Sequence, residues 1–359
     1  MTDSKIEPVV AVPPYSKTRD APLNLLVRIC AGTVVATALA FLLNNYLTFW
    51  REWPGVISFY ADQGWLSFAP LDQALTPNAL QLGWFQFGLY LCAVAIVVAY
   101  VMATPGRSLR LEADRLSAFS AYVVRVAFFG VLLIGLVDML ISLLRVEDLL
   151  SAVVGEELSQ ALARPQFRGL YVHFPLVLLS FVIGLLVRTL GFTWLALLVV
   201  LAEFQIVLWR FVFSYEQVYM GDLVRFWYAA MFLFASSYTL LHEGHVRVDV
   251  LYAHFGRRAK AWSNIFGLTC MGLPLCWIIL TLGMWSRASS INSPLFSFEI
   301  SQSGYGMYVK YLMAVYLVVF ALSMIAQFSS YLLTNVANLR QEPGGESVVS
   351  GSSHEPVSA

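Results

Sequence analysis

Residues 117–143 read SAFSAYVVRVAFFGVLLIGLVDMLISL, an apolar run whose only charged side chains are Arg125 and Asp138. A helix needs about 20 predominantly apolar residues to cross the hydrocarbon core of a bilayer. This run is long enough, and it lacks the alternation of apolar and polar residues that is typical of membrane barrel strands. It therefore predicts a transmembrane helix.

Seven further segments meet the same criterion, which predicts an all-α, polytopic integral membrane protein with about eight transmembrane helices. They lie at about 25–48, 81–103, 169–188, 191–214, 224–241, 262–286 and 308–334. The first run continues through Phe41-Leu42-Leu43 and so exceeds the 7–15 residues of a signal-peptide core, which predicts a retained helix. Only residues 187–191 separate the fourth span from the fifth, which predicts a tight helical hairpin.

The composition excludes other classes of protein. Of the 359 residues, 59% are apolar and only 12% are charged, against roughly 25% charged in an average soluble domain. The 22 basic residues balance 22 acidic ones, so the chain lacks the net positive charge that is typical of proteins that bind nucleic acid. The four cysteines all lie inside apolar runs and predict no disulfide framework.

Two basic loops predict the orientation. Arg107, Arg110 and Arg115 lie between the second and third spans, and Arg257 and Arg258 lie between the sixth and seventh. Short cytoplasmic loops are enriched in Arg and Lys. We therefore expect both termini in the cytoplasm.

Motifs for catalysis are missing from the sequence, which has no GxSxG, no Walker-type phosphate loop and no GxGxxG. The histidines of the 242–245 stretch are three apart, so they do not form the zinc-protease motif, whose histidines are four apart. We expect no enzyme activity, no metal and no cofactor, with His173 an isolated polar residue at a helix end. The alternative is a membrane redox or enzyme subunit that binds a cofactor at His173 or at His242 and His245.

Charged residues inside membrane spans are expensive and often functional. Arg125 and Asp138 each lie within reach of an interface, so we expect their side chains to extend towards water. Glu203 lies deeper and is predicted to make a buried polar contact between helices. The candidates for buried polar contacts with partner helices are Glu203, Arg210, Asp222, Arg225 and Lys310. A self-sufficient secondary transporter is a further alternative, but the spans lack the paired Gly or Pro breaks typical of such proteins, and we expect them to be uninterrupted.

The stretch from Glu203 onward carries a family pattern. Residues 208–213 read LWRFVF at the end of one span, and residues 222–226 read DLVRF at the start of the next. The following loop consists of His242, Glu243, Gly244, His245, Val246, Arg247, Val248 and Asp249, and Arg257 and Arg258 come after it. Over about residues 190–336, this pattern resembles the small membrane subunit of the TRAP (tripartite ATP-independent periplasmic) transporters, whose most recognisable feature is a glycine followed by His-Val-Arg-Val-Asp.

The resemblance implies a non-catalytic, multi-pass subunit of the bacterial inner membrane. Its partners would be membrane lipids, a large permease subunit that imports an organic acid or related solute with sodium, and a periplasmic solute-binding protein that docks nearby. Sodium coupling is then expected on the large subunit, and the small subunit acts as a scaffold.

The family's small subunit usually has four helices, so the helices before residue 189 are a departure that we expect to enlarge the scaffold or contact the partners. The predicted segments are a disordered cytoplasmic N-terminus (1–22), a four-helix membrane extension (23–188) with an amphipathic outer helix near 146–162, a TRAP-like four-helix domain (189–336) and a disordered cytoplasmic tail (337–359).

Overall fold

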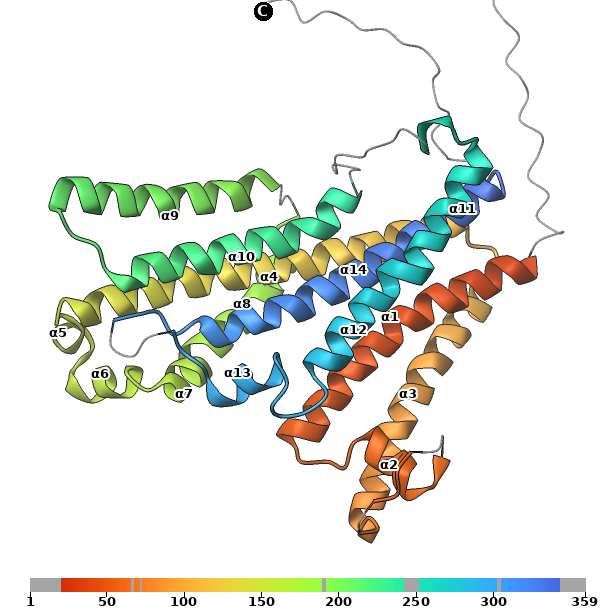
Figure 1. The fold of residues 1–359 in the computed structure, drawn as a ribbon, viewed down its shortest axis with the longest axis horizontal. Helices are drawn as coiled ribbons and strands as arrows, with labels where there is room; N and C mark the ends of the chain where they lie inside the picture. Colours follow the sequence, from red (N-terminus) through yellow and green to blue (C-terminus); the bar gives the residue numbers. More distant parts are fainter. Residues whose placement is uncertain are drawn as a thin grey trace, which may run out of the picture.

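The computed structural model describes residues 21–65, 68–71, 73–188, 192–241, 252–301 and 305–342. Within these ranges the regular structure is helical and contains no strand, which confirms the all-α class. Eight helical spans are long and apolar enough to cross a membrane, as predicted. They pack into one elongated bundle (Figure 1).

Six of the spans are single α-helices. These are α1 (Ala21–Trp50), α3 (Pro77–Ala103), α4 (Leu109–Val146), α9 (Phe192–Phe213), α10 (Val218–Leu241) and α14 (Lys310–Leu339). The fourth span joins α7 (Pro165–Arg168), the π-helical η2 (Gly169–His173) and α8 (Phe174–Leu186), and the seventh joins α11 (Arg257–Gly267), the π-helical η4 (Leu268–Gly272) and α12 (Leu273–Gly283). Short helices lie between the spans: α2 (Val56–Asp62), α5 (Leu150–Val154), α6 (Glu156–Leu162), the 3-10 helix η3 (Tyr252–His254) and α13 (Asn292–Ser297).

Two spans contain a π-helical turn, but each remains one continuous helix, as expected. Each turn ends two residues before a proline, η2 before Pro175 and η4 before Pro274. Proline has no N–H to donate, and its ring crowds the carbonyl one turn earlier. Wider turns of this kind occur where the regular hydrogen-bond ladder of a helix is disturbed.

Helix α4 begins eight residues before the predicted span. Ser108 caps it, because the Ser108 hydroxyl accepts a hydrogen bond from the Leu111 amide at 3.2 Å. Its first turns carry Arg110, Glu112 and Arg115, so hydropathy alone does not detect them. At 38 residues, α4 is about 57 Å long and extends beyond a hydrocarbon core of about 30 Å.

The centre of the bundle is the pair α4 and α14, with α10, α8 and α1 packed around it. Buried side chains of α4, α10 and α14 form one core, which includes Ile134, Phe226 and Tyr316. Helix α9 packs along α10 at one edge, and α3 packs along α1 at the other (Figure 1). The most peripheral spans are therefore α9 and α3.

The predicted hairpin of the fourth and fifth spans is wrong. Helix α8 packs against α4, and α9 packs against α10, so the two do not pack along each other. The α4–α8 contact is close: a Cβ added to Gly184 would lie 2.9 Å from the Val126 side chain. This approach holds α8 against α4.

Residues 146–162 form two short helices, α5 and α6, instead of the one amphipathic helix that was predicted. The break is at Gly155, whose φ of +85° suits glycine. Leu150 and Leu162 are buried, whereas Glu156 and Glu157 are exposed. The apolar spacing therefore identified two buried side chains, but Leu149, Val153 and Leu158 of the same pattern are exposed, and the turn at Gly155 was not predicted.

The starts of α1, α4 and α11 and the end of α14 lie at one end of the bundle, which we call the tail end (Figure 1). Helices α5, α6, α7 and α13 lie at the opposite end, the loop end. Helix α1 starts at Ala21 and α14 continues to Leu339, so residues 21–22 and 337–339 of the segments predicted to be disordered are helical. Residues 1–20 and 343–359 lie outside the described part of the chain.

Candidate functional site

A buried charged network lies near the loop end, around Asp138 of α4. Its Oδ1 accepts hydrogen bonds from Arg168 Nη1 at 2.9 Å and from His173 Nε2 at 3.1 Å. Its Oδ2 accepts a hydrogen bond from the Tyr308 backbone amide at 2.8 Å. Asp138 and Arg168 are fully buried, so the expectation that Asp138 reaches water is wrong. The ion pair and the amide compensate for removing this carboxylate from solvent.

His173 extends this network to α14. Its Nδ1 lies 2.8 Å from the Tyr311 hydroxyl, and its Nε2 faces Asp138. A neutral imidazole satisfies both contacts when Nε2–H donates to Asp138 and Nδ1 accepts from Tyr311. His173 is buried, so the expectation of an isolated histidine at a helix end is also wrong. A cofactor bound at His173 would have to displace one of these partners.

Two arginines hold the segment that leads into α14. The Cζ atoms of Arg168 and Arg145 lie 4.1 Å and 4.6 Å from the centroid of the Tyr308 ring. Arg145 Nη2 also donates to the Gly306 carbonyl at 2.8 Å. A guanidinium over an aromatic face is attracted by the ring's negative face. Helices α4 and α7 therefore fix residues 306–308, which lie just before α14 in the sequence.

Three predicted residues, Asp222, Arg225 and Lys310, line one cavity at the loop end. The cavity has a volume of about 460 Å³ and is also lined by Glu299 and Ser301. Asp222 is buried, and its Oδ2 accepts hydrogen bonds from the Ser301 hydroxyl at 2.7 Å and from the Met307 amide at 3.0 Å. The buried polar contacts of Asp222 are therefore with this chain's own loop.

The two cations of the cavity are more open. Arg225 Nη1 lies 3.6 Å from Asp222 Oδ1, and Lys310 Nζ lies 2.6 Å from Glu299 Oε1. Both basic side chains are exposed. Contacts of either residue with a partner helix stay a prediction.

The structure does not bring Glu203 and Arg210 into this cluster. Both lie exposed on α9, and Arg210 pairs with Glu216 in the loop after it. Glu203 makes no hydrogen bond or ion pair with any residue that the structure describes, so its predicted polar contact with another helix is not formed among these residues. In the same loop the Tyr215 hydroxyl donates to Glu147 at the end of α4. Burial and this hydrogen bond raise the pKa of Tyr215.

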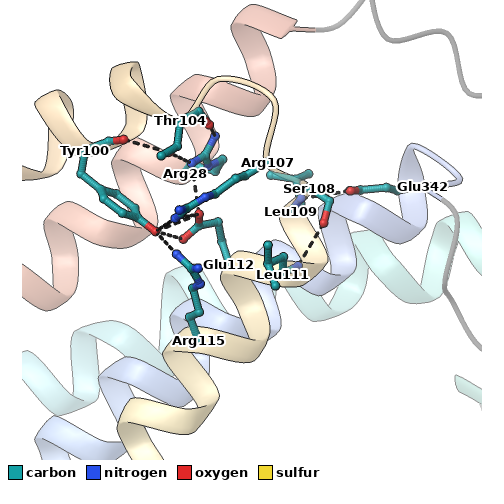
Figure 2. A network of polar contacts seen from close by, with 10 residues as sticks. All are labelled: Arg28, Tyr100, Thr104, Arg107, Ser108, Leu109, Leu111, Glu112, Arg115 and Glu342. Atoms are coloured by element: carbon teal, nitrogen blue, oxygen red, sulfur yellow. Dashed lines mark hydrogen bonds and ion pairs between the residues drawn. The ribbon is translucent and has the colours of Figure 1, made fainter.

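A second buried network lies at the tail end and joins α1, α3 and α4 (Figure 2). Arg28 donates from Nη1 to the Thr104 carbonyl at 2.7 Å and from Nη2 to Glu112 Oε1 at 3.1 Å. The Tyr100 hydroxyl lies 3.1 Å from each oxygen of Glu112. Glu342, just after α14, accepts from the Leu109 amide at 3.1 Å. An anion is favoured there, because the amides of a helix N-terminus carry partial positive charge.

The family-motif residues His242 to Asp249 lie outside the described part of the chain. Arg257 and Arg258 begin α11, where both side chains are exposed at the tail end. In the part of the chain that the structure describes, no group of three His, Cys, Asp or Glu side chains is arranged to hold a metal ion.

The spans from α9 to α14 are the part of the bundle that can be compared with a known family. Residues 195–334 match the DctQ component of the tripartite ATP-independent periplasmic transporters. This confirms the resemblance predicted over about residues 190–336. DctQ is a transporter component family, not an enzyme family. Neither a curated protein nor a solved structure matches the chain.

The match shows which parts of the chain the Asp138 network connects. We call residues 195–334 the DctQ-like segment and residues 21–188 the extension. The Asp138 network joins α4, α7 and η2 of the extension to Tyr308 and Tyr311 of the DctQ-like segment. Sequence reasoning missed it because its members lie far apart in the sequence; the signal was a charge at position 138 that no neighbour along its own helix could pair.

Proposed function

We propose that this chain is the non-catalytic small permease subunit of a sodium-coupled TRAP transporter in the bacterial inner membrane. It serves as a scaffold for a large permease subunit, which imports an organic acid or related small solute. The observation that carries this proposal is the match of the DctQ-like segment, which supplies four of the eight apolar spans.

The lining of one cavity favours a scaffold role over a transport role. A cavity of about 420 Å³ lies among α4, α8, α10 and α14, and its lining is almost entirely apolar, with Val126, Val177 and Leu322 among the side chains. An organic acid needs hydrogen-bond donors or cations to replace its water. This cavity suits a lipid chain, and the substrate site is then on the large subunit.

The charge distribution supports an orientation with the tail end in the cytoplasm. The exposed Arg257 and Arg258 lie at that end together with Arg107 and Arg115, as the positive-inside rule requires. The loop end then faces the periplasm and presents the cavity of Asp222, Arg225 and Lys310 near the docking site of the solute-binding protein.

In this proposal the extension stabilises the DctQ-like segment by packing along it. Helix α4 packs along both α10 and α14, which are two of the four spans of the DctQ-like segment. The Asp138 network fixes the loop end of this contact, and Glu342 fixes the tail end. The extension therefore enlarges the scaffold that a four-helix subunit would provide.

Co-purification tests the proposal. The chain is expressed with a TRAP large permease subunit and a solute-binding protein from the same organism, with an affinity tag on the chain alone. We expect the large subunit to be retained through detergent extraction and gel filtration. Recovery of the tagged chain without the large subunit from membranes that contain both would contradict the proposal.

A further inference from the structure

Helix α9 is the least covered span of the bundle. It packs along α10 through Leu198, Ala202 and Ile206, which lie on one side of the helix. The other side is open, and Val200 is 61% exposed. Figure 1 shows α9 as the outermost helix at its edge of the bundle.

Glu203 lies halfway along this open helix. It is about 15 Å from either end of α9, by the rise of 1.5 Å per residue. Its side chain is exposed, and no other described residue pairs with it. A glutamate side chain is too short to reach either interface from that depth, and an ionisable group facing hydrocarbon is unfavourable. Lipid is therefore a poor cover for this part of α9.

Helix α3 provides a comparison at the opposite edge of the same molecule. It is equally peripheral, packing against α1 and α2, and Ile96 is 62% exposed. From Pro77 to Ala103, however, α3 contains no charged residue. The two edges differ in chemistry although they are alike in exposure. Only the α9 edge carries a charge that a protein partner could satisfy.

We infer that the large permease subunit covers the side of α9 formed by Ala196, Val200, Glu203 and Val207, with a membrane helix that offers Glu203 a hydrogen bond. These four positions are three or four residues apart and so share one side of the helix. The partner helix presents a basic, amide or hydroxyl side chain at mid-membrane depth. This inference rests on the proposed function.

The packing of the bundle also favours the large permease subunit as the partner that covers α9. The extension packs on α10 and α14 but leaves α9 uncovered. Helix α9 lies within the DctQ-like segment, the part of the chain that matches a family of transporter subunits. The open side of α9 is therefore a surface of the DctQ-like segment that the extension does not cover.

Photo-crosslinking in native membranes tests the surface. A benzophenone amino acid is placed at Val200 or Val207 of α9, and at Leu91 or Ile96 of α3 as the matched control, in cells that produce the whole complex. The α9 positions are expected to yield a product with the large subunit, and the α3 positions none. Products that contain two copies of this chain, or no α9 product at all while the large subunit still co-purifies, would overturn the inference and leave the proposed function standing.

Two substitutions test the role of Glu203. Glu203→Leu removes the polar group and suits lipid, so the chain should remain at least as abundant in the membrane, while the co-purified large subunit falls about tenfold. Glu203→Gln keeps an acceptor oxygen and should retain more of the large subunit than Glu203→Leu does. A Glu203→Leu chain that retains the large subunit as well as the wild type would overturn the inference. Failure of the wild-type chain to retain it would instead contradict the proposed function.

Discussion

Asp138 of α4 and His173 of η2 meet inside the bundle, with Asp138 Oδ1 and His173 Nε2 3.1 Å apart. One residue lies on the helix that packs along the DctQ-like segment, and the other contacts Tyr311 of α14 through its second ring nitrogen. This pair therefore connects the extension to the helices that resemble a transporter subunit, and its loss should loosen that connection.

Asp138→Asn should destabilise the folded chain strongly. The substitution leaves the fully buried Arg168 without its counter-charge, and breaking a buried ion pair on one side costs about 3–5 kcal/mol. Thermal unfolding of the detergent-solubilised chain measures the loss. Asp148→Asn, at an exposed position beyond the end of the same helix, is the matched control and should unfold like the wild type. Equal stability of the two variants would contradict the assigned ion pair.

His173→Phe should also destabilise the chain, by about 1–3 kcal/mol, because Asp138 and Tyr311 each lose a hydrogen-bond partner in a buried site. The aromatic ring keeps much of the volume of the imidazole. In the double variant with Asp138→Asn, the loss of unfolding free energy should be smaller than the sum of the two single losses, since the two residues share one interaction. Strictly additive losses would show that they act independently.

Gly135→Ala should separate α4 from α10. A Cβ at Gly135 would lie 2.4 Å from Trp227 Nε1, and the Trp227 indole donates to the Val131 carbonyl at 3.2 Å. Overpacking of this kind costs about 1–3 kcal/mol. Gly88→Ala in α3 is the control, because no atom lies within 4 Å of its added Cβ and alanine is the better helix former. Unfolding temperatures should fall for the first variant only.

Glu342→Ala should weaken the tail end of the bundle. Its carboxylate accepts from the Leu109 amide at the start of α4, and losing such a cap costs about 0.5–2 kcal/mol. Gln341→Ala, at the exposed neighbouring position, should have little effect. Limited proteolysis of the chain in detergent would report the change as faster cleavage near residue 108. Cleavage at the wild-type rate would show that the Glu342 contact does not hold this end.

The spans could be predicted from the sequence because each one depends on the apolar content of a single segment. The pairing of the spans could not, since Asp138 finds its partners 30 to 170 residues away along the chain. The short 187–191 connection suggested a hairpin, but the close contact of Gly184 with Val126 places α8 on α4 instead. Neighbours in the sequence do not report which face of a helix another helix covers.

The residues of the candidate site could be predicted only in part, because their charges are visible in the sequence but their partners are not. Asp222, Arg225 and Lys310 stood out as charges near span ends, and the structure brings them to one cavity. Glu203 stood out as a charge in mid-span, but its partner cannot be read from this chain, because the described residues offer none. Arg168 was missed, since an arginine near a span end is normally taken as an interfacial residue.

Solute uptake into proteoliposomes that have sodium outside but none inside tests the central claim most directly. Vesicles that contain only this chain should show no flux of a candidate organic acid, whereas vesicles that contain it with the large subunit, supplied with the solute-binding protein, should accumulate the solute down an inward sodium gradient. Accumulation or dissipation of a solute gradient by this chain alone would contradict the account.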